Sequence, residues 1–410
     1  MAIYLDHAAT SPMGSDVIAA YASALAVVGN PASIHSQGQN AKRMLEEARE
    51  HVARSLGADS VEVTFTGGGT EAVNLGIKGL FWARNLVAGR AGLAGHAVLD
   101  GHSGEERAVS RPRPRILVPE GEHHATIDAI DWLIKHENAV VEWIPIDALG
   151  RISLPALSAA LGPDVALVTV LLANNEVGTI QPVAEVVALA AAHDVPVHVD
   201  AIAGYGYLPL DFHALGAAAL SVSAHKIGGP VGTGALVIAR STKIEALVHG
   251  GNQQRGRSGT QDVAGAVAFG LAAQQIDLGA DLSVLRDRLI RGIQSAVPQA
   301  ILRGDPVDRL PGNVHFTYPG CEGDSLLFLL DVAGFSVSTG SACQAGVPEA
   351  SHVLLAMGLS EADARGALRM TLGHSTTESD VDALVAALPA AVASATRAGL
   401  AAHVPTFGQG

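Results

Sequence analysis

Short segments rich in β-branched residues alternate with helical segments along most of the chain, and this alternation restricts the fold more than any other feature. The expected strands are VEVTFT, RILVPE, VVEWIPID, ALVTVLLA, VPVHVDA, ALSVSA and TGALVIA. Between them, GTEAVNLGIKGLFWARNL, ATIDAIDWLIKH, SLPALSAAL and AEVVALAAAHD have helical periodicity. This pattern predicts an α/β, doubly wound fold whose mixed, mostly parallel sheet is flanked by helices. Ligands of such sheets bind beyond the carboxyl ends of the strands, so we expect the site there.

The length predicts two domains, because 410 residues exceed the size at which one core stops growing. After Thr260 the sequence changes to a long helical run, then short strands near GNVHFTY and FSVST, then a helical end. We assign residues 15–260 to a large domain, and residues 1–14 with 261–410 to a smaller α+β domain. Residues 85–115 end in SRPRPR, whose prolines exclude a helix, and predict a mobile surface insertion.

Charge and cysteine content exclude several classes of protein. The formal net charge is −14, and no cluster of Lys and Arg offsets it, so we expect neither nucleic acid nor membrane as a direct partner. No apolar stretch reaches spanning length, and the start lacks a secretory signal, which predicts a cytoplasmic protein. Cys321 and Cys343 are too few for a disulfide framework, and no zinc-binding spacing occurs, so we predict free thiols and no metal site.

Charged residues follow two of the expected strands. VPVHVDA ends at Asp200, and LSVSAHKIGG carries Ser223, His225 and Lys226 at its end. One interpretation is a surface ion pair, which stabilises a protein little. The other is a pyridoxal phosphate site, in which Lys226 forms a Schiff base and Asp200 holds the protonated pyridine nitrogen. These residues alone leave both interpretations open.

Three further segments fit a cofactor site but also have ordinary explanations. FTGGGTEAVN places a glycine turn ending at Gly69 before Thr70, which opens a helix whose N–H groups could bind phosphate or simply be capped. EGEHHAT places His123 after a strand, where an imidazole could stack on a flat ring or move protons. LLANNEVGT places Asn175 at another strand end, in a sequence that also favours a turn.

Together these segments resemble the cysteine desulfurases, the class V, fold-type I pyridoxal phosphate enzymes that make persulfide for iron–sulfur clusters and thio-modification. The resemblance covers almost the whole chain and is closest to the iron–sulfur-cluster and nitrogen-fixation types. It rests, in family order, on YLDHAATSPM, GNPASIHSQG, FTGGGTEAVN, EHHAT, NNEVGTIQP, HVDA, SAHKIGGPVGTGAL, RSGT, STGSAC and LRMTLG.

The resemblance implies a role for each matching residue. Lys226 would be the Schiff-base lysine, Asp200 the partner of the pyridine nitrogen, and His123 the acid/base that stacks on the ring. The phosphate would be held by Gly69, Thr70, Ser223, His225 and Thr260, the last of which reaches the neighbouring subunit's cofactor in the family. The substrate carboxylate would be held by Asn175 and by Arg369, whose guanidinium can bind it through two hydrogen bonds, and Asn30 would line the entrance. A homodimer follows from the shared site.

The implied reaction converts L-cysteine to L-alanine. Lys226 would remove the Cα proton, and the Cys343 thiolate would attack the substrate sulfur to form a persulfide, which a sulfur-acceptor protein would receive. A free thiol has a reference pKa of about 8.5, so Cys343 needs a basic group or a positive field nearby. The glycines at 340 and 346 would permit its movement.

Some features depart from the family pattern. Ala203 stands where the family has a glutamine that bonds the cofactor's ring oxygen, and Tyr205 or Tyr207 are candidates to replace it. The loop HGGNQQRGRSGT is one residue shorter than usual, which leaves the roles of Arg255 and Arg257 open.

Two other functions compete with desulfuration. One is a related class V aminotransferase, lyase or selenocysteine lyase-like enzyme that does not need Cys343. The other is a scaffold protein without cofactor, which the presence of Lys226, Asp200 and Arg369 disfavours.

Overall fold

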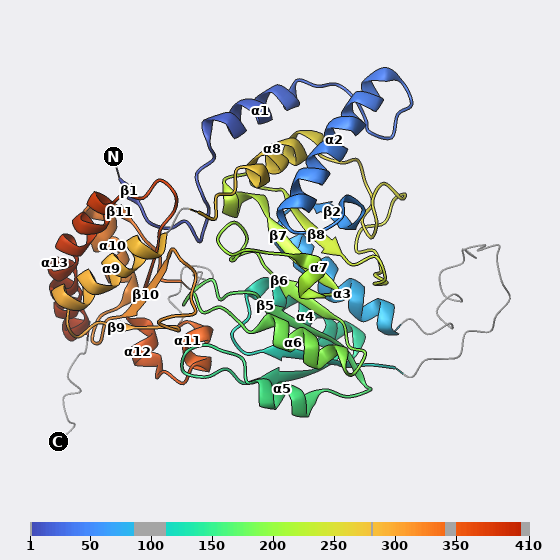
Figure 1. The fold of residues 1–410 in the computed structure, drawn as a ribbon. Coiled ribbons are helices and arrows are strands. Elements are labelled where there is room, and N and C mark those ends of the chain that lie inside the picture. Colours follow the sequence, from blue (N-terminus) through green and yellow to red (C-terminus); the bar gives the residue numbers. More distant parts are fainter. Residues whose placement is uncertain (1, 86–111, 280–281, 341–349, 403–410) are drawn as a thin grey trace.

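The computed structural model describes residues 2–85, 112–279, 282–340 and 350–402. The large domain is built on a seven-stranded sheet with the strand order β2-β8-β7-β6-β5-β3-β4 (Figure 1). Only the pairings of β8 with β2 and with β7 are antiparallel, so the predicted mixed, mostly parallel sheet is confirmed. The strands are β2 (Val63–Thr66), β3 (Arg115–Pro119), β4 (Val140–Ile144), β5 (Val165–Leu171), β6 (Val197–Asp200), β7 (Ala219–Ser223) and β8 (Gly234–Ile238).

Helices cover both faces of this sheet. Hydrophobic side chains of α3 (Gly69–Asn85) and α4 (His124–Glu137) pack on one face. Those of α2 (Ser36–Ser55), α5 (Leu154–Ala160), α6 (Val183–Ala191) and α8 (Val263–Gln274) pack on the other. Every residue of β5, VALVTVL, is therefore buried, as expected for a strand covered on both sides. Helix α1 (Ser15–Leu25) lies along α8, and the short α7 (Phe212–Leu215) precedes β7.

The small domain joins the two ends of the chain. Its three-stranded antiparallel sheet has the order β12-β10-β9, and β1 (Ile3–Tyr4) pairs in parallel with β11 (Phe335–Ser336). Leu5 lies in its core beside residues more than 280 positions away, including Phe316. The other elements are β9 (Ile301–Leu302), β10 (Asn313–Thr317), β12 (Ala367–Thr371), α9 (Leu282–Ala296), α10 (Gly323–Val332), α11 (His352–Ala356), α12 (Glu361–Arg365) and α13 (Glu378–Ala402).

The expected domain boundary after Thr260 needs correction at α8. Ala266, Phe269 and Ala273 of this helix belong to the hydrophobic core of the large domain, and α8 packs along α2. The large domain therefore continues through α8. Most of the insertion expected at residues 85–115 lies outside the described residues, since the structure describes α3 up to Asn85 and resumes at residue 112.

The expectation that no apolar stretch reaches spanning length is wrong for α13. Its residues Glu378–Arg397 are long and apolar enough to cross a membrane by length and composition alone. In the structure, Leu384, Leu388 and Val392 of this helix are buried in the core of the small domain, and α13 packs against α9 and α10. This packing accounts for its apolar character.

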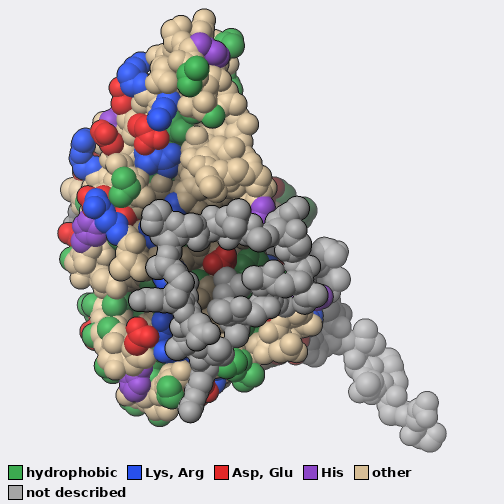
Figure 2. All heavy atoms as spheres, turned by 90° about the vertical axis from the view of Figure 1, so that its right-hand side faces the viewer, with side chains coloured by type: hydrophobic (Ala, Val, Ile, Leu, Met, Phe, Trp, Pro, Cys, Tyr) green, Lys and Arg blue, Asp and Glu red, His purple; other side chains and the backbone are tan. Residues whose placement is uncertain are grey.

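Charged side chains of both signs are mixed on the face of the molecule shown in Figure 2. On α2, for example, Arg43 pairs with Glu47 at 2.6 Å and Arg49 pairs with Glu46 at 3.1 Å. These four side chains of α2 therefore neutralise one another in pairs.

Candidate active site

One hollow at the carboxyl ends of β5, β6 and β7 contains most of the residues that the sequence singled out. Its cavity volume is about 240 Å³. Eight of its lining residues are predicted cofactor-binding residues: Gly69, Thr70, His123, Asn175, Asp200, Ser223, His225 and Lys226. They meet because Leu171 on β5 lies opposite Asp200 on β6, and Asp200 lies opposite Ser221 on β7. Polar residues that end neighbouring parallel strands therefore reach the same edge of the sheet.

Lys226 lies in a short 3₁₀ turn, Ala224–Ile227, directly after β7. Its Nζ donates hydrogen bonds to the carbonyl oxygens of Ala8 and Ala9, so the N-terminal segment reaches into the site. Burial, and next the positive charge of Arg369, lower the pKa of Lys226 to about 8. The lysine therefore gives up its proton more readily than an exposed lysine does.

Two buried carboxyl groups belong to this region, one in the lining of the hollow and one outside it. Asp200 accepts a hydrogen bond from the Ile202 N–H at 3.0 Å, and burial raises its pKa to about 6, against the opposing charge of Lys226. Sequence reasoning missed the second, Glu122, although EGEHHAT contains it. Its Oε1 accepts from the Leu171 N–H at 2.8 Å, and burial raises the pKa of Glu122 to about 8. Glu122 therefore holds its proton more strongly than Asp200, and Asp200 is the group that ionises first.

His123 caps the N-terminus of α4. Its Nδ1 accepts a hydrogen bond from the Ala125 N–H at 3.0 Å, which leaves the proton of the neutral ring on Nε2. His123 lines the hollow and is exposed as a residue, but desolvation of its ring by the surrounding protein, and next the charge of Lys226, lower the pKa of His123 to about 4. The ring is therefore neutral at physiological pH.

The end of the hollow beside α3 has the features of a phosphate site. The Oγ of Ser223 is buried and has no hydrogen-bond partner within the described residues. A Cβ at Gly69 would lie 2.5 Å from Ile202 Cδ1 and 3.2 Å from Ser223 Cβ, so any other residue there would have to displace the Ile202 side chain. Gly69 also begins the 17-residue helix α3, whose N-terminal N–H groups favour an anion. These residues fit the phosphate of pyridoxal phosphate.

Arg369 comes to the site from β12 of the small domain. It is buried, and its Nη1 donates to the Asn175 carbonyl at 3.0 Å while its Nη2 contacts Asp6 at 2.9 Å. Its Nε is buried without a partner in the described residues. Arg369 does not line the hollow itself but lies directly behind Asn175, which does.

Comparison with known proteins agrees with this geometry. Residues 3–93 and 102–384 match the model of the family Aminotransferase class-V. The chain belongs to the class V aminotransferase family. An IscS-like cysteine desulfurase of Mycobacterium tuberculosis is 50% identical over 409 residues, which cover 97% of this chain and 98% of that protein. This similarity places the class V protein with the cysteine desulfurases, as the sequence motifs indicated.

Solved structures support the same assignment. A NifS-like protein has a TM-score of 0.83 and 30% identity, and the match covers 96% of this chain and 100% of that one. A structure described as SspA in complex with cysteine has a TM-score of 0.75 and 28% identity, and covers 90% and 98% of the two chains. The fold of a class V enzyme is therefore present over nearly the whole length.

Besides Arg369, three predicted residues are not placed in the hollow of this class V protein. Thr260 and Asn30 are exposed, and neither is among the lining residues. Asn30 lies in the loop between α1 and α2, where its Oδ1 accepts from the Ala32 N–H. Cys343 lies outside the described residues.

The structure also shows where the residues that depart from the family pattern lie. Ala203 lines the hollow, whereas the Tyr205 hydroxyl lies 2.7 Å from Ser55 Oγ and is buried away from it. Tyr205 therefore cannot take the place of a side chain at 203. Arg255 donates to backbone carbonyls, including that of Ile238 at 3.0 Å, so it has a structural role.

Outside the hollow, Asp59, Glu62 and His213 bring their ligand atoms within 4.8 Å of one another. His213 Nε2 already lies 2.7 Å from Glu62, and Arg240 pairs with Asp59 at 2.6 Å. These contacts form an ion-pair network that satisfies the acidic groups.

Proposed function

We propose that the chain is a pyridoxal phosphate-dependent cysteine desulfurase that converts L-cysteine to L-alanine and transfers the sulfur to Cys343 as a persulfide. The observation that carries this proposal is the meeting in one hollow of Lys226, Asp200 and the Ser223 hydroxyl, which has no partner in the described part of the chain. The names of the relatives and the cysteine complex of one structural neighbour support the same reaction and substrate.

The residues of the hollow suit the three parts of the cofactor. Gly69, Thr70, Ser223 and His225 would hold the phosphate, His123 would lie against the ring, and Asp200 would bind the ring nitrogen. When bound, pyridoxal phosphate withdraws electrons from the substrate Cα. Because Glu122 keeps its proton at a higher pH than Asp200 does, the negative charge resides on Asp200, the residue that lines the hollow.

Lys226 and Arg369 would act on the substrate itself. With a pKa of about 8, Lys226 is partly neutral near physiological pH and can accept the Cα proton. Arg369, held in place by Asp6 and by the Asn175 carbonyl, would bind the substrate carboxylate. The Nε2–H of His123 is a donor beside Lys226 that could return a proton to the product.

Gly340 and Ser351, which are described on either side of the Cys343 segment, both lie close to Glu176. Ser351 Oγ donates to Glu176 Oε2 at 2.5 Å, and a Cβ at Gly340 would lie 3.4 Å from the same oxygen. Glu176 directly follows Asn175 of the hollow. The described residues that flank the Cys343 segment therefore lie beside Glu176, the neighbour in sequence of Asn175, which supports a role for Cys343 at the active site.

The test is turnover of L-cysteine by purified, cofactor-loaded protein, with alanine and sulfide measured in the presence of a thiol. Cys343→Ala should abolish sulfide release, and mass spectrometry of the wild type should find an added sulfur atom on Cys343. Cys321→Ala is the matched control, because that thiol is buried 3.2 Å from Thr396 Oγ1, away from the hollow. Full desulfuration by Cys343→Ala would refute the persulfide role.

A second candidate, a related class V aminotransferase or lyase, rests on Ala203. This residue leaves space beside Lys226 that could admit a different amino acid. Product analysis across amino acids separates the two: alanine from cysteine favours desulfuration, whereas a keto acid favours amino transfer.

We further propose a cytoplasmic homodimer that passes sulfur to an acceptor protein of iron–sulfur assembly or thio-modification. Thr260 and Asn30 are exposed and lie outside the hollow of the same chain. Their position supports a second subunit, at whose site they would act. Light scattering of the purified protein should give twice the chain mass of 41.8 kDa, and a monomer would contradict the shared site.

A further inference from the structure

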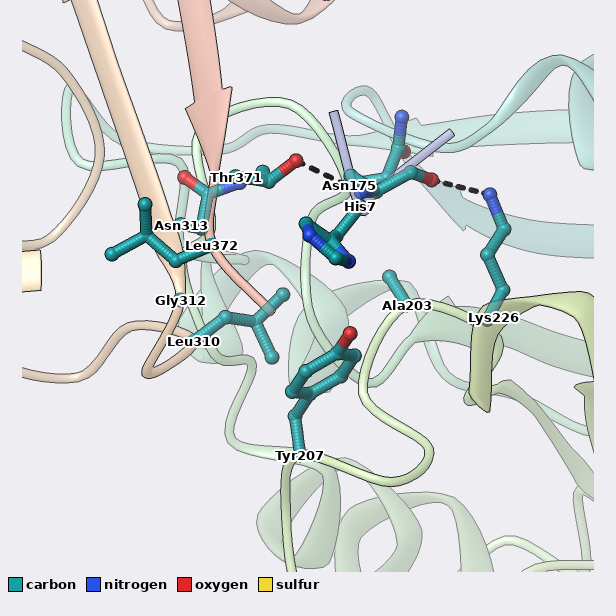
Figure 3. Close-up of a pocket in the computed structure, with 11 residues that line it drawn as sticks. His7, Asn175, Ala203, Tyr207, Lys226, Leu310, Gly312, Asn313, Thr371 and Leu372 are labelled. Atoms are coloured by element: carbon teal, nitrogen blue, oxygen red, sulfur yellow. Dashed lines mark hydrogen bonds between the residues drawn. The ribbon is translucent and has the colours of Figure 1, made fainter. Parts of the chain in front are cut away.

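A second, smaller cavity adjoins the cofactor hollow on the side of the small domain (Figure 3). It shares Asn175, Ala203 and Lys226 with the hollow, so Ala203 stands between the two spaces. Its volume is about 30 Å³, enough for one or two water-sized groups. The other lining residues are His7, Ala8, Tyr207, Leu310, Gly312, Asn313, Thr371 and Leu372.

Two polar atoms of residues that line this cavity, His7 Nε2 and Asn313 Oδ1, are buried without a hydrogen-bond partner among the described residues. His7 is only 4% exposed. Figure 3 shows its ring directed into the space between Ala203 and Tyr207. A buried polar atom without a partner is unfavourable, so an occupant that forms a hydrogen bond with it would be stabilised.

The position of the His7 ring is fixed by its surroundings. A Cβ at Gly373 would lie 2.2 Å from two atoms of the ring, so the ring packs directly on that glycine. The Tyr4 ring meets it edge-on, with centroids 5.1 Å apart. Burial lowers the pKa of His7, with His374 the next cause, so the ring is neutral and Nε2 can pair with an uncharged group.

The rest of the cavity favours a small group with one polar atom. Ala8, Ala203, Leu310 and Leu372 present aliphatic side chains to it. The Tyr207 hydroxyl is engaged with Ser11 Oγ at 3.3 Å. The neutral His7 nitrogen, together with Asn313 Oδ1, thus offers hydrogen bonds in a largely aliphatic cavity next to Lys226, where the substrate Cα must lie.

We propose that this His7 cavity binds the side-chain tip of the amino acid substrate, and that it selects amino acids with one methylene carrying a single small hydrogen-bonding atom. The thiol of cysteine is such a group. The proposal rests on the proposed function for the position of the substrate, and it adds His7 as a residue that determines specificity.

The test uses amino acids that bind without being desulfurated. Dissociation constants for L-alanine, L-serine, L-2-aminobutyrate and L-leucine are measured from the change they cause in the visible spectrum of the cofactor-loaded protein. L-serine should bind about two- to tenfold more tightly than L-2-aminobutyrate, which has the same number of side-chain heavy atoms but no polar one. L-leucine should bind more weakly than both, because the cavity is too small for its branched end.

Two variants of His7 test whether this residue causes the preference for L-serine over L-2-aminobutyrate. His7→Phe should remove the preference for L-serine over L-2-aminobutyrate while L-alanine binding is kept, and His7→Gln should restore part of it. His374→Phe is the matched control and should keep the preference, because His374 lines a third cavity, beside Pro12 and Gln275, and not this one.

Equal binding of L-serine and L-2-aminobutyrate by the wild type would overturn the proposal and leave the cavity to water. So would a preference that persists in His7→Phe. A protein that binds no cofactor, or that does not act on L-cysteine, would instead overturn the proposed function. The wild-type series needs no variant, so the test holds even if His7→Phe does not fold.

Discussion

Ser223→Ala should change the stability of the protein and its cofactor affinity in opposite directions. Without cofactor, the Ser223 hydroxyl is buried and has no partner in the described residues, a situation that costs about 1–3 kcal/mol. Its removal should therefore stabilise the cofactor-free protein by about 1 kcal/mol. A hydrogen bond to a charged phosphate contributes about 1.5–3 kcal/mol, so the same change should weaken cofactor binding about 10- to 150-fold.

The assays are the thermal midpoint of the cofactor-free protein and a titration with pyridoxal phosphate followed by absorbance. Ser221→Ala is the matched control on the same strand, because Ser221 Oγ is equally buried but lies 2.7 Å from His198 Nε2. Ser221→Ala should lower the midpoint and leave the cofactor affinity unchanged. Wild-type cofactor affinity in Ser223→Ala would refute the assignment of this hydroxyl to the phosphate.

Three further outcomes are expected. Arg369→Lys should raise the KM for L-cysteine about tenfold or more, because one ammonium cannot replace a two-pronged guanidinium, while the cofactor spectrum stays unchanged; an unaltered KM would exclude Arg369 from carboxylate binding. Gly69→Ala should weaken cofactor binding, since the new Cβ would meet Ile202 at 2.5 Å, and titration with pyridoxal phosphate measures this directly. In the cofactor-free protein, acetylation of Lys226 by acetic anhydride should rise with pH to a midpoint near 8, because only the neutral amine reacts. A midpoint near the ordinary lysine value of about 10.4 would contradict the effect of burial on this group.

The sequence was sufficient to predict the hollow because its residues follow strands. Asp200 and Ser223 end buried strands that run parallel and side by side, and parallel strands bring such ends to one edge. Lys226 and His123 follow within a few residues of a strand end, so the local chain carries them to the same edge. Residues placed in this way need no knowledge of tertiary packing.

Features set by long-range packing were not predictable in this way. His7 and Asp6 reach the site only because the N-terminal segment docks between the domains, which no local pattern indicates. The position of α8 was misjudged because its sequence, VAGAVAFGLAAQ, is small and apolar on all sides and does not show which surface it covers. The sequence around Glu122 is typical of a polar loop. Only the structure shows that its carboxyl group is buried and accepts a hydrogen bond from the Leu171 N–H.

The pairing of β1 with β11 has a consequence for synthesis on the ribosome. Ile3 must wait for Phe335, roughly 330 residues later, which takes about 15–70 s at the usual rates of elongation. During that time the large domain can complete its sheet, whose last strand ends at Ile238, while Leu5 has no core to enter. The first residues of this protein are therefore among the last to fold, and an N-terminal fusion that restrains them would delay the small domain without hindering the large one.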